Sequence, residues 1–508
     1  MIVAMLRTSI TAAVAAVAIL SGALCGASAG AEQRAIGPLP DKSFVTRHRG
    51  VFGGQRVSYT ATIAPIAITD DQGRRQATIT SIAFTRTDGD SRAQRPVMFL
   101  FNGGPGASSS ILHLSGFGPH RVSLPGAPED EGRTPYAVVD NEDTPLEMVD
   151  LVFIDPIGTG FSRALPGTDL RQFFSLQGDA ASVAQFIRKW LVQNRRTGAH
   201  IYVAGESYGT VRAAVLTDEF RKQPLPGRLA GLILIGQALD TTQTQQTSGN
   251  DTPYVLYLSS YAATAWYHGK IEPAGRSREQ FMEEVRAFAL NEYAPALLHG
   301  SRLLPTQRKH IAERVAAYTA LPVSLIEAND LRIGTRLFLE TLGGNGKPLL
   351  RADSRFAVPS ASSTGMPTGY AEGYANGIKD VLRELAVPDA SDYRLELQGE
   401  FDWDFTLPDD VNIQQTYNNV SPMVVAAMKC DPNLRVFVAS GEFDLMASPS
   451  SAELTYSHNG FPTERVELHT YPAGHMPYIH APSRKALMND IRAFIARTSP
   501  EGLHAESP

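Results

Sequence analysis

Cysteine is almost absent from this sequence, with 2 residues, Cys25 and Cys430, among 508. We expect Cys25 to be removed with an N-terminal segment, so that the mature chain cannot form an internal disulfide. A small scaffold held together by disulfides is therefore excluded. The hydrophobic fraction of 43 % instead indicates a soluble globular protein that is stabilised by a sizeable core.

Long apolar runs are also missing, apart from one near the beginning. Arg7 precedes an apolar, alanine-rich stretch at 11–24, and Ala27 and Ala29 then supply the small residues that a signal peptidase requires. We therefore expect residues 1–29 to be a cleaved signal peptide, and the protein to be exported to a periplasm or secreted. Because no comparable run follows, we expect no membrane association after cleavage.

Charge of one sign is not concentrated anywhere in the sequence. The formal net charge is −6, and no basic tract or arginine stripe is present, so we expect no nucleic-acid partner. Neither a His-Glu-x-x-His pattern nor a cysteine–histidine cluster occurs, which predicts no metal and no other cofactor. Composition leaves the oligomeric state open.

The sequence does contain short apolar segments that alternate with amphipathic stretches. Two alternating stretches, 58–69 and 76–87, predict a hairpin of strands around residues 70–73. Apolar strands that alternate with helices are typical of a mostly parallel sheet covered by helices on both faces. We predict strands of this kind at 96–101, 151–154, 200–204, 232–235 and 434–438, and helices at 179–193, 210–222 and 483–497.

The alternation stops at about residue 240 and resumes near residue 420. Helical patterns at 279–298 and 306–319 lie inside this interval. We therefore expect residues 240–419 to form an inserted, partly helical cap over the active end of the sheet. Residues 35–239 and 420–498 then form the two parts of one α/β core.

A nucleophile elbow is the clearest motif in the chain. Gly205-Glu206-Ser207-Tyr208-Gly209 directly follows a predicted strand and precedes a predicted helix, which is the context that a G-x-S-x-G elbow requires. The small residues on either side of the serine allow a tight turn that holds its hydroxyl at the end of the strand. We therefore predict an α/β-hydrolase fold with Ser207 as the nucleophile.

A serine nucleophile needs a base, and the base needs an acid that orients it. In this fold the three residues follow in the order serine, acid, histidine. Asp444 follows the predicted strand at 434–438, and His475 lies in a loop before the last predicted helix. We predict a Ser207–Asp444–His475 triad. Rival residues are Glu442 for the acid and, for the base, His458, His469 and His480.

The tetrahedral intermediate of acyl transfer also requires an oxyanion hole, which two backbone N–H groups usually form. The N–H of Tyr208 is one candidate. The glycine-rich loop at 102–106 follows the strand at 96–101 and provides another, because glycine lets the backbone approach a ligand closely. No Gly-Lys-Ser/Thr follows this loop, which argues against a phosphate-binding loop.

Four segments of the chain form a set that is more specific than any one of them. They are Asn102-Gly103-Gly104-Pro105-Gly106, Asp155-Pro156-Ile157-Gly158-Thr159-Gly160-Phe161-Ser162, Gly205-Glu206-Ser207-Tyr208-Gly209 and Gly474-His475-Met476-Pro477. In order and spacing they resemble the serine carboxypeptidase family. The resemblance implies hydrolysis of the last peptide bond of a peptide with a free C-terminus, without a metal. It also implies that the N–H groups of Gly104 and Tyr208 form the oxyanion hole.

The resemblance further implies that Asn102, Gly103 and Glu206 bind the carboxylate of the substrate. A glutamate beside a substrate carboxylate is stable only when the two groups share a proton, because two like charges cannot both ionise cheaply at close range. We therefore expect acidic pH to favour activity.

The chain departs from the family at several positions. Gly116 stands where the family has a second glutamate, Ala107 stands where a cysteine often follows the glycines, and Gly209-Thr210 replaces the usual Ala-Gly. These departures indicate a divergent branch of bacterial type. They leave open an esterase or acyltransferase that uses the same triad. A non-catalytic binding module is disfavoured because the expected catalytic residues are present.

Overall fold

The computed structural model describes residues 43–89, 95–130, 134–344, 346–357, 366–367, 369–399, 401–406 and 418–499. The predicted signal peptide at 1–29 lies outside the described residues. Within the described ranges, no helix is both long and apolar enough to cross a bilayer.

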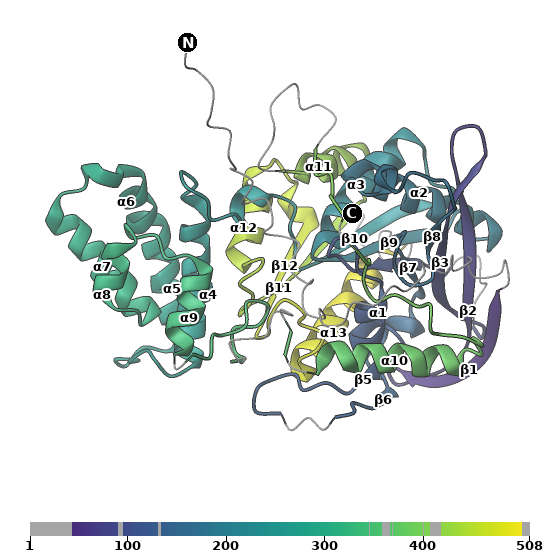
Figure 1. Ribbon diagram of the computed structural model, residues 1–508, viewed down its shortest axis with the longest axis horizontal. Coiled ribbons are helices and arrows are strands. Elements are labelled where there is room, and N and C mark those ends of the chain that lie inside the picture. Colours follow the sequence, from purple (N-terminus) through teal and green to yellow (C-terminus); the bar gives the residue numbers. More distant parts are fainter. Residues whose placement is uncertain are drawn as a thin grey trace, which may run out of the picture.

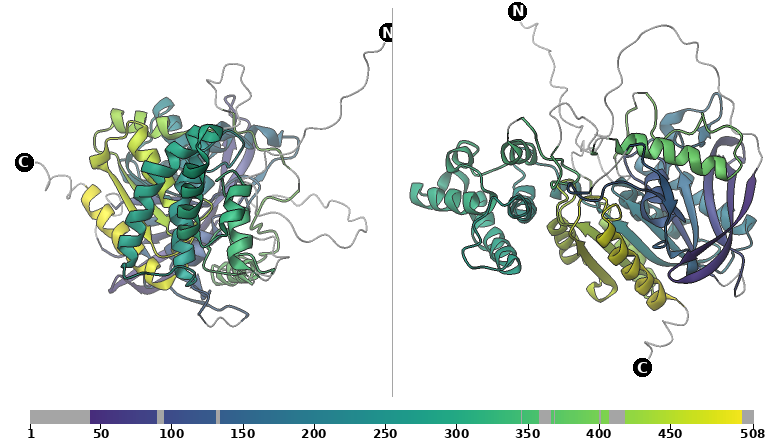
Figure 2. Two further views of the ribbon diagram at one scale, coloured as in Figure 1. Left: turned by 90° about the vertical axis from the view of Figure 1, so that its left-hand side faces the viewer. Right: turned by 90° about the horizontal axis from the view of Figure 1, so that it is seen from below.

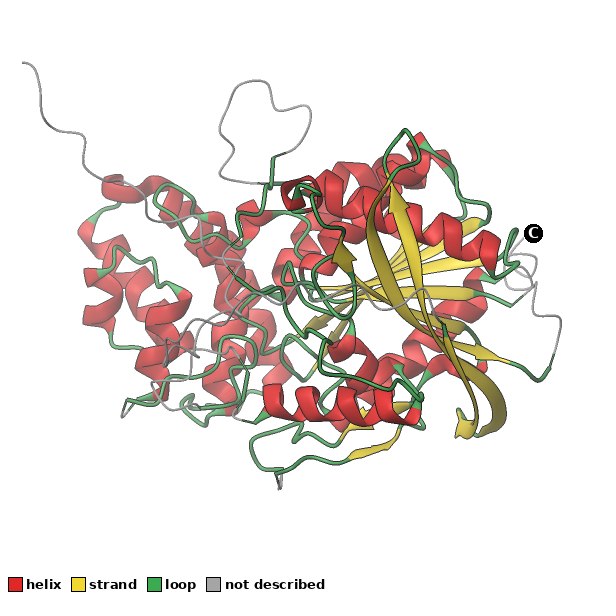
Figure 3. Ribbon diagram, turned by 45° about the vertical axis from the view of Figure 1, so that its right-hand side comes forward, coloured by secondary structure: helices red, strands yellow, loops and turns green. Residues whose placement is uncertain are grey.

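A large sheet forms the centre of the molecule (Figure 1, Figure 3). The described residues contribute ten strands to it, in the order β1-β2-β3-β7-β4-β9-β10-β11-β12, with β8 paired to β3. From β7 to β12 along this order the strands are parallel, whereas β1, β2 and β3 are antiparallel. The predicted mostly parallel sheet is thus confirmed.

The strands have the following bounds: β1 (Phe44–Phe52), β2 (Gln55–Thr69), β3 (Arg75–Arg86), β4 (Val97–Phe101), β5 (His120–Val122), β6 (Val138–Asp140), β7 (Asp150–Asp155), β8 (Arg163–Ala164), β9 (His200–Glu206), β10 (Arg228–Ile235), β11 (Arg435–Gly441) and β12 (Val466–Tyr471). The predicted hairpin strands match β2 and β3 closely. β1 was not predicted, and β5 pairs with β6 in a small sheet of its own.

Helices cover the sheet and also form a separate group beside it (Figure 1, Figure 2). They are α1 (Ser110–Leu112), α2 (Leu176–Gln193), α3 (Tyr208–Lys222), α4 (Thr252–Tyr267), α5 (Arg278–Phe288), α6 (Ala294–His299), α7 (Pro305–Thr319), α8 (Val323–Ala328), α9 (Thr335–Gly343), α10 (Tyr370–Glu384), α11 (Ser421–Cys430), α12 (Pro449–His458) and α13 (Ala481–Thr498).

Neighbouring residues of β4 show how the sheet separates two hydrophobic cores. Phe99 packs on one face, where its ring meets Trp190 of α2 edge-on at 5.4 Å. Leu100 packs on the opposite face, in the cluster that contains Leu487 and Ile491 of α13. A strand covered on both sides must therefore be apolar throughout. Each fully buried side chain of this size contributes about 1.5–3 kcal/mol.

Helices α4–α9 enclose a third hydrophobic cluster, which lies beside the sheet (Figure 1). This cluster also takes in Phe443 and Leu445, from the loop after β11. The residue between them, Asp444, is therefore anchored from both sides. Helix α10 packs instead in the cluster that contains α13. The assignment of residues 240–419 to one cap stays a prediction.

The predicted helix at 279–298 is divided in the structure. α5 gives way to a π-helical turn at Ala289–Tyr293, and α6 follows. Pro295 has no N–H to donate to the preceding turn, which favours such a break. The helices predicted at 306–319 and 483–497 match α7 and α13 closely.

Candidate active site

Parallel strands bring the predicted site residues to one edge of the sheet. β4 leads directly into the glycine-rich loop at 102–106, and β9 ends at Glu206, immediately before Ser207. The loops that follow β11 and β12 carry Asp444 and His475. The carboxyl ends of parallel strands are where α/β sheets place their ligands.

Ser207 lies on a sharp turn between β9 and α3. Its φ of 56° and ψ of −127° fall in a region that a residue with a side chain rarely adopts. A Cβ on Gly205 would lie 2.2 Å from the carbonyl oxygen of Gly209, and a Cβ on Gly209 would lie 2.8 Å from that of Phe101. The glycine spacing therefore makes the turn possible, and it holds Ser207 at the N-terminus of α3.

His475 and Asp444 form a buried hydrogen-bonded pair. Nδ1 of His475 lies 2.7 Å from Oδ2 of Asp444, and the two residues are 6 % and 0 % exposed. The other oxygen of Asp444 accepts hydrogen bonds from the N–H groups of Met446 at 2.7 Å and Ala447 at 3.0 Å. These bonds fix the carboxylate in the position from which it orients the imidazole ring.

The rival residues have other partners. Glu442 forms an ion pair with Arg278. Each rival histidine contacts a side chain close to it in the sequence, as the structure shows for His458, His469 and His480. The geometry therefore favours Asp444 and His475 as the acid and the base.

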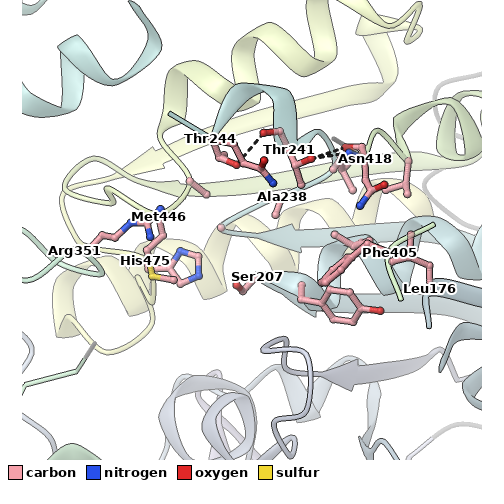
Figure 4. Close-up of a pocket in the computed structure, with 17 residues that line it drawn as sticks. Leu176, Ser207, Ala238, Thr241, Thr244, Arg351, Phe405, Asn418, Met446 and His475 are labelled. Carbon is pink, nitrogen blue, oxygen red and sulfur yellow. Dashed lines mark hydrogen bonds between the residues drawn. The ribbon is translucent and has the colours of Figure 1, made fainter. Parts of the chain in front are cut away.

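The second nitrogen of His475, Nε2, faces Glu206. It lies 3.2 Å from Oε1 of Glu206, but the angles do not form a hydrogen bond, and Nε2 has no hydrogen-bond partner among the described residues. Ser207 and His475 nevertheless line one pocket (Figure 4). Catalytic hydrogen bonds in a free enzyme are often misaligned and tighten when substrate binds.

Two carboxylates control the charge of His475. Burial lowers the pKa of His475, but the negative charges of Asp444 and then Glu206 outweigh burial and raise the pKa to about 10. The two carboxylates therefore favour the protonated imidazole in the free protein. It can act as a base only after Nε2 loses its proton, and Oε1 of Glu206 is an acceptor within reach.

The predicted oxyanion donors meet where the glycine-rich loop approaches the elbow. Tyr208 is the first residue of α3, so its N–H has no acceptor within the helix. A Cβ on Gly103 would lie 2.5 Å from the backbone nitrogen of Tyr208, and this close approach requires glycine. Gly104 has a φ of 107°, which also favours glycine. The loop and the first turn of α3 thus come together beside Ser207.

Two of the residues predicted to bind a substrate carboxylate are bonded to each other. Nδ2 of Asn102 donates to Oε2 of Glu206 at 2.8 Å, and Oδ1 of Asn102 accepts from the N–H of Leu112 at 3.0 Å. Both side chains are buried. Because both bonds fix the orientation of the Asn102 amide, its second Nδ2 hydrogen has a defined direction in which it can bind a ligand.

Tyr478 is a residue of this region that was not predicted from the sequence. It is 0 % exposed, and its hydroxyl has no hydrogen-bond partner among the described residues. The hydroxyl lies near Asn102 and Glu206. Burial first, then the charge of Glu206, raise the pKa of Tyr478 well above its usual value, and the nearby Asn102 amide lowers it in part. A Cβ on Gly116 would lie 2.8 Å from Cβ of Tyr478. The tyrosine therefore fills the space that glycine leaves. Its position three residues after His475 was the signal available in the sequence.

A buried ion pair supports the elbow. Nε of Arg212 lies 2.7 Å from Oδ2 of Asp179, and Nη1 of Arg212 donates to the carbonyl oxygen of Asn102 at 2.8 Å. The hydroxyl of Tyr208 donates to the same carboxylate at 3.2 Å. Neither member of the pair could be predicted from the sequence, because each is an ordinary helix residue until α2 and α3 pack together.

Asp155 links the second motif to the glycine-rich loop. One carboxylate oxygen accepts from the N–H of Ser109 at 2.9 Å and from its hydroxyl at 2.8 Å. Burial outweighs these bonds and raises the pKa of Asp155 to about 6. A Cβ on Gly160 would lie 1.8 Å from the other carboxylate oxygen. This part of the motif therefore braces the loop.

A pocket of about 720 Å³, including its open mouth, lies beside Ser207 (Figure 4). Its wall contains one arginine, Arg351, among apolar and uncharged polar residues. These are Leu176, Tyr208, Val211, Gly236, Ala238, Leu239, Thr241, Thr244, Gln245, Phe405, Asn418, Val420, Met446 and Ala447. Across the described part of the chain, no group of three or more histidine, cysteine, aspartate or glutamate residues is placed to hold a metal ion.

Comparison with known proteins agrees with the predicted resemblance. A model of the serine carboxypeptidase family matches residues 83–471. The chain is similar to Kex1Δp, a prohormone-processing carboxypeptidase from Saccharomyces cerevisiae, with 15 % identity, 87 % of this chain and 92 % of that chain covered, and a TM-score of 0.53. At this identity the likeness shows the α/β-hydrolase fold alone.

Two further solved structures have lower TM-scores. The peroxisomal α/β-hydrolase Lpx1 from Saccharomyces cerevisiae shares 13 % identity, with 92 % of this chain and 90 % of that chain covered and a TM-score of 0.34. An esterase from Pyrococcus furiosus shares 10 % identity, with 86 % and 91 % covered and a TM-score of 0.33. The family match, which spans more than half of the sequence, is decisive. The chain belongs to the serine carboxypeptidase family.

Proposed function

We propose that this protein releases the C-terminal residue of a peptide through an acyl-enzyme at Ser207. His475 acts as the general base and then as the general acid, and Asp444 orients it. The N–H groups of Gly104 and Tyr208 stabilise the oxyanion.

The bonded pair of Asn102 and Glu206, which lies against His475, is the observation that carries this proposal. A simple esterase gains nothing from this carboxylate, because its charge adds to that of Asp444 in favouring the protonated base. A carboxypeptidase gains a donor, since a glutamate that carries a proton can hydrogen-bond to the terminal carboxylate of the substrate. Gly103 lets the backbone approach that carboxylate closely.

We assign Tyr478 to the same carboxylate site. Gly116 replaces the second glutamate of the family, and the tyrosine packs against this glycine. A phenol keeps its proton over the whole range in which a glutamate titrates. Tyr478 can therefore donate to a substrate carboxylate without sharing a proton with it.

Binding of the terminal carboxylate activates the base by moving one proton. In the free protein we place this proton on Nε2 of His475, because the pKa of the imidazole is raised and Nδ1 is bonded to Asp444. When a substrate carboxylate enters, the proton passes to Oε1 of Glu206, which then donates it in a hydrogen bond to the substrate. His475 becomes neutral in the same step, so the base is ready only when a free C-terminus is bound.

Chemistry then follows from this arrangement. His475 takes the proton of Ser207 Oγ while that oxygen attacks the last peptide carbonyl carbon. His475 next gives the proton to the leaving nitrogen, the C–N bond breaks, and the last residue departs. Water then attacks the resulting ester with the same two proton transfers through His475, which releases the shortened peptide and restores Ser207.

A mass-spectrometric time course tests the proposal. One peptide is supplied with a free and with an amidated C-terminus, at about pH 4 to 8, with wild-type protein and with Ser207→Ala. We expect a ladder of residues lost from the free C-terminus alone, and no ladder with the variant.

Loss of residues from both peptides, or from neither, would contradict the proposal. If wild-type protein then hydrolyses a small acyl ester and Ser207→Ala does not, the triad stands and the function is that of an esterase or acyltransferase.

We also propose that residues 1–29 direct export and are removed after Ala29, on the basis of their composition. The mass of the protein purified from the periplasm or the medium tests this. A chain that keeps its first residues and stays in the cytoplasmic fraction would contradict it.

A further inference from the structure

The pocket beside Ser207 has a positive charge in its wall that the proposed chemistry does not use. Arg351 lines this pocket together with Met446 and His475 (Figure 4). Nε of Arg351 donates to the carbonyl oxygen of Leu445 at 3.0 Å, which fixes the side chain. In the described structure the guanidinium forms no ion pair, and no aspartate or glutamate belongs to the described wall of the pocket.

The order of the strands shows which part of a peptide this pocket receives. Asn102 follows β4, Ser207 follows β9, Gly236 follows β10 and Met446 follows β11, and these strands are neighbours in that order. The terminal carboxylate site therefore lies on the β4 side of Ser207. The part of the pocket formed by Gly236, Arg351 and Met446 lies on the β10 and β11 side, and neither Asn102 nor Glu206 lines the pocket.

A peptide bound with its terminal carboxylate at Asn102 and Glu206 places its last residue on the β4 side. The residue before the scissile bond then lies on the other side of Ser207, at the pocket. This residue forms the acyl group of the acyl-enzyme, so the pocket contacts the substrate in both halves of the reaction.

We propose that Arg351 makes this pocket select an acidic side chain, glutamate or aspartate, in the residue before the scissile bond. The inference rests on the proposed function, because the position of the terminal carboxylate defines the two sides. A guanidinium binds a carboxylate through two parallel hydrogen bonds, which a neutral amide of the same shape cannot match. A partly buried charge without a counter-ion also favours an anionic ligand over a neutral one.

Arg351 also has a structural contact, because its bond to Leu445 lies next to Asp444. A purely structural role would change the rate for all substrates by one factor. The test therefore compares two substrates on the same variant, so that a general loss of activity cancels.

The experiment uses four blocked peptides that differ only in the residue before the last, which is Glu, Gln, Leu or Lys. The kcat/KM for release of the last residue is measured at about pH 6, where a glutamate side chain is ionised. The variants are Arg351→Gln, Arg351→Lys and, as a control in the same wall, Thr244→Val.

Wild-type protein is expected to prefer Glu over Gln by about 10-fold or more, the selectivity typical of a hydrogen bond to a charged group. Arg351→Gln is expected to bring this ratio close to one, and Arg351→Lys to keep part of it. Thr244→Val is expected to leave the ratio unchanged. A ratio near one in wild-type protein, or an unchanged ratio in Arg351→Gln, would overturn the inference.

Failure of the proposed function gives a different result. If no peptide loses its last residue, the same ratio is measured on methyl esters of blocked Glu and blocked Gln, which present the same acyl side to the pocket. A preference for Glu that Arg351→Gln removes would then support the inference without the carboxypeptidase activity. If no ester is hydrolysed either, both proposals are refuted.

Discussion

Replacing Tyr478 with phenylalanine should make the protein more stable and less active on free C-termini. The ring of Tyr478 is fully buried, and its hydroxyl has no hydrogen-bond partner among the described residues. Tyr478→Phe removes this one polar group and keeps the shape of the ring. Measurements of stability and of activity on this variant therefore separate the effect of the hydroxyl on folding from its effect on substrate binding.

The expected gain in stability follows from the burial of the hydroxyl. A buried polar group without a hydrogen bond costs about 1–3 kcal/mol of folding free energy. Tyr478→Phe should raise the free energy of unfolding by about this amount, measured by urea denaturation of the purified protein. Tyr456→Phe is a matched control, because the hydroxyl of Tyr456 is also buried and without a partner in the described structure, but on α12 and outside the pocket wall.

The expected loss of activity follows from the proposed contact with the substrate carboxylate. A hydrogen bond to a charged group contributes about 1.5–3 kcal/mol, which corresponds to a fall in kcat/KM of about 10-fold to 150-fold. Tyr478→Phe should show this fall on a peptide with a free C-terminus. It should leave the hydrolysis of a small ester without a terminal carboxylate unchanged. Tyr456→Phe should change neither rate.

Three results would refute this reasoning. A variant Tyr478→Phe that is less stable than wild type would mean that the hydroxyl is well bonded in solution. A variant that is more stable but equally active on free C-termini would mean that the hydroxyl does not touch the substrate. An equal loss on the peptide and on the ester would assign Tyr478 to the support of His475 instead.

Three further changes test other parts of the site. Ser207→Ala should lower kcat by about a million-fold without changing the circular dichroism spectrum, because the triad acts as a unit; near-normal turnover would remove Ser207 from the assignment. Glu206→Gln removes one of the charges that raise the pKa of His475. The acid limb of the pH–rate profile for a small ester should therefore move to lower pH. An acid limb that does not move would mean that Glu206 has a structural role only. Asp155 has its pKa raised from 3.8 to about 6, so it should contribute about 3 kcal/mol of stability at low pH that is lost as the pH rises through that range. Asp155→Asn should flatten this dependence in urea denaturation, and an unchanged slope would assign it to other groups.

The sequence was most informative where local geometry alone dictates the residue types. The elbow requires glycine at 205 and 209 because a side chain there would collide with backbone atoms only a few residues away or on the adjacent strand. The five residues of the motif are therefore enough to predict the tight turn. The apolar strands were predictable for a similar reason, because a strand such as β4 is buried on both faces.

The sequence was least informative where a role depends on contacts between distant segments. Arg212 and Asn102 are 110 residues apart, and only the packing of α3 against the end of β4 brings the arginine to the carbonyl group that it binds. Choosing between Asp444 and Glu442 required similar information, because both lie in one loop. The structure distinguishes them through Phe443 and Leu445, which pack into the helical cluster and leave Asp444 directed at His475.

The charge of His475 leads to a prediction about pH that separates the two kinds of substrate. Its pKa is raised from 6.5 to about 10, so protonation stabilises the folded protein fully below about pH 6.5, and this stability is lost as the pH rises through 10. The same proton blocks the base. An ester without a terminal carboxylate cannot accept a hydrogen bond from a protonated Glu206, so the proton stays on His475. Such an ester is hydrolysed only by the small fraction of molecules in which His475 is neutral.

Rates on such an ester should therefore rise with pH up to about 10. Rates on a peptide with a free C-terminus should instead be high below about pH 10 and fall as the pH rises through it, because the proton that Glu206 and the substrate carboxylate share is then lost. Profiles of kcat/KM for a blocked dipeptide and for the ester of the same acyl group test this directly. Profiles of the same shape would mean that the terminal carboxylate does not move the proton, and that the contact between His475 and Glu206 has no part in activating the base.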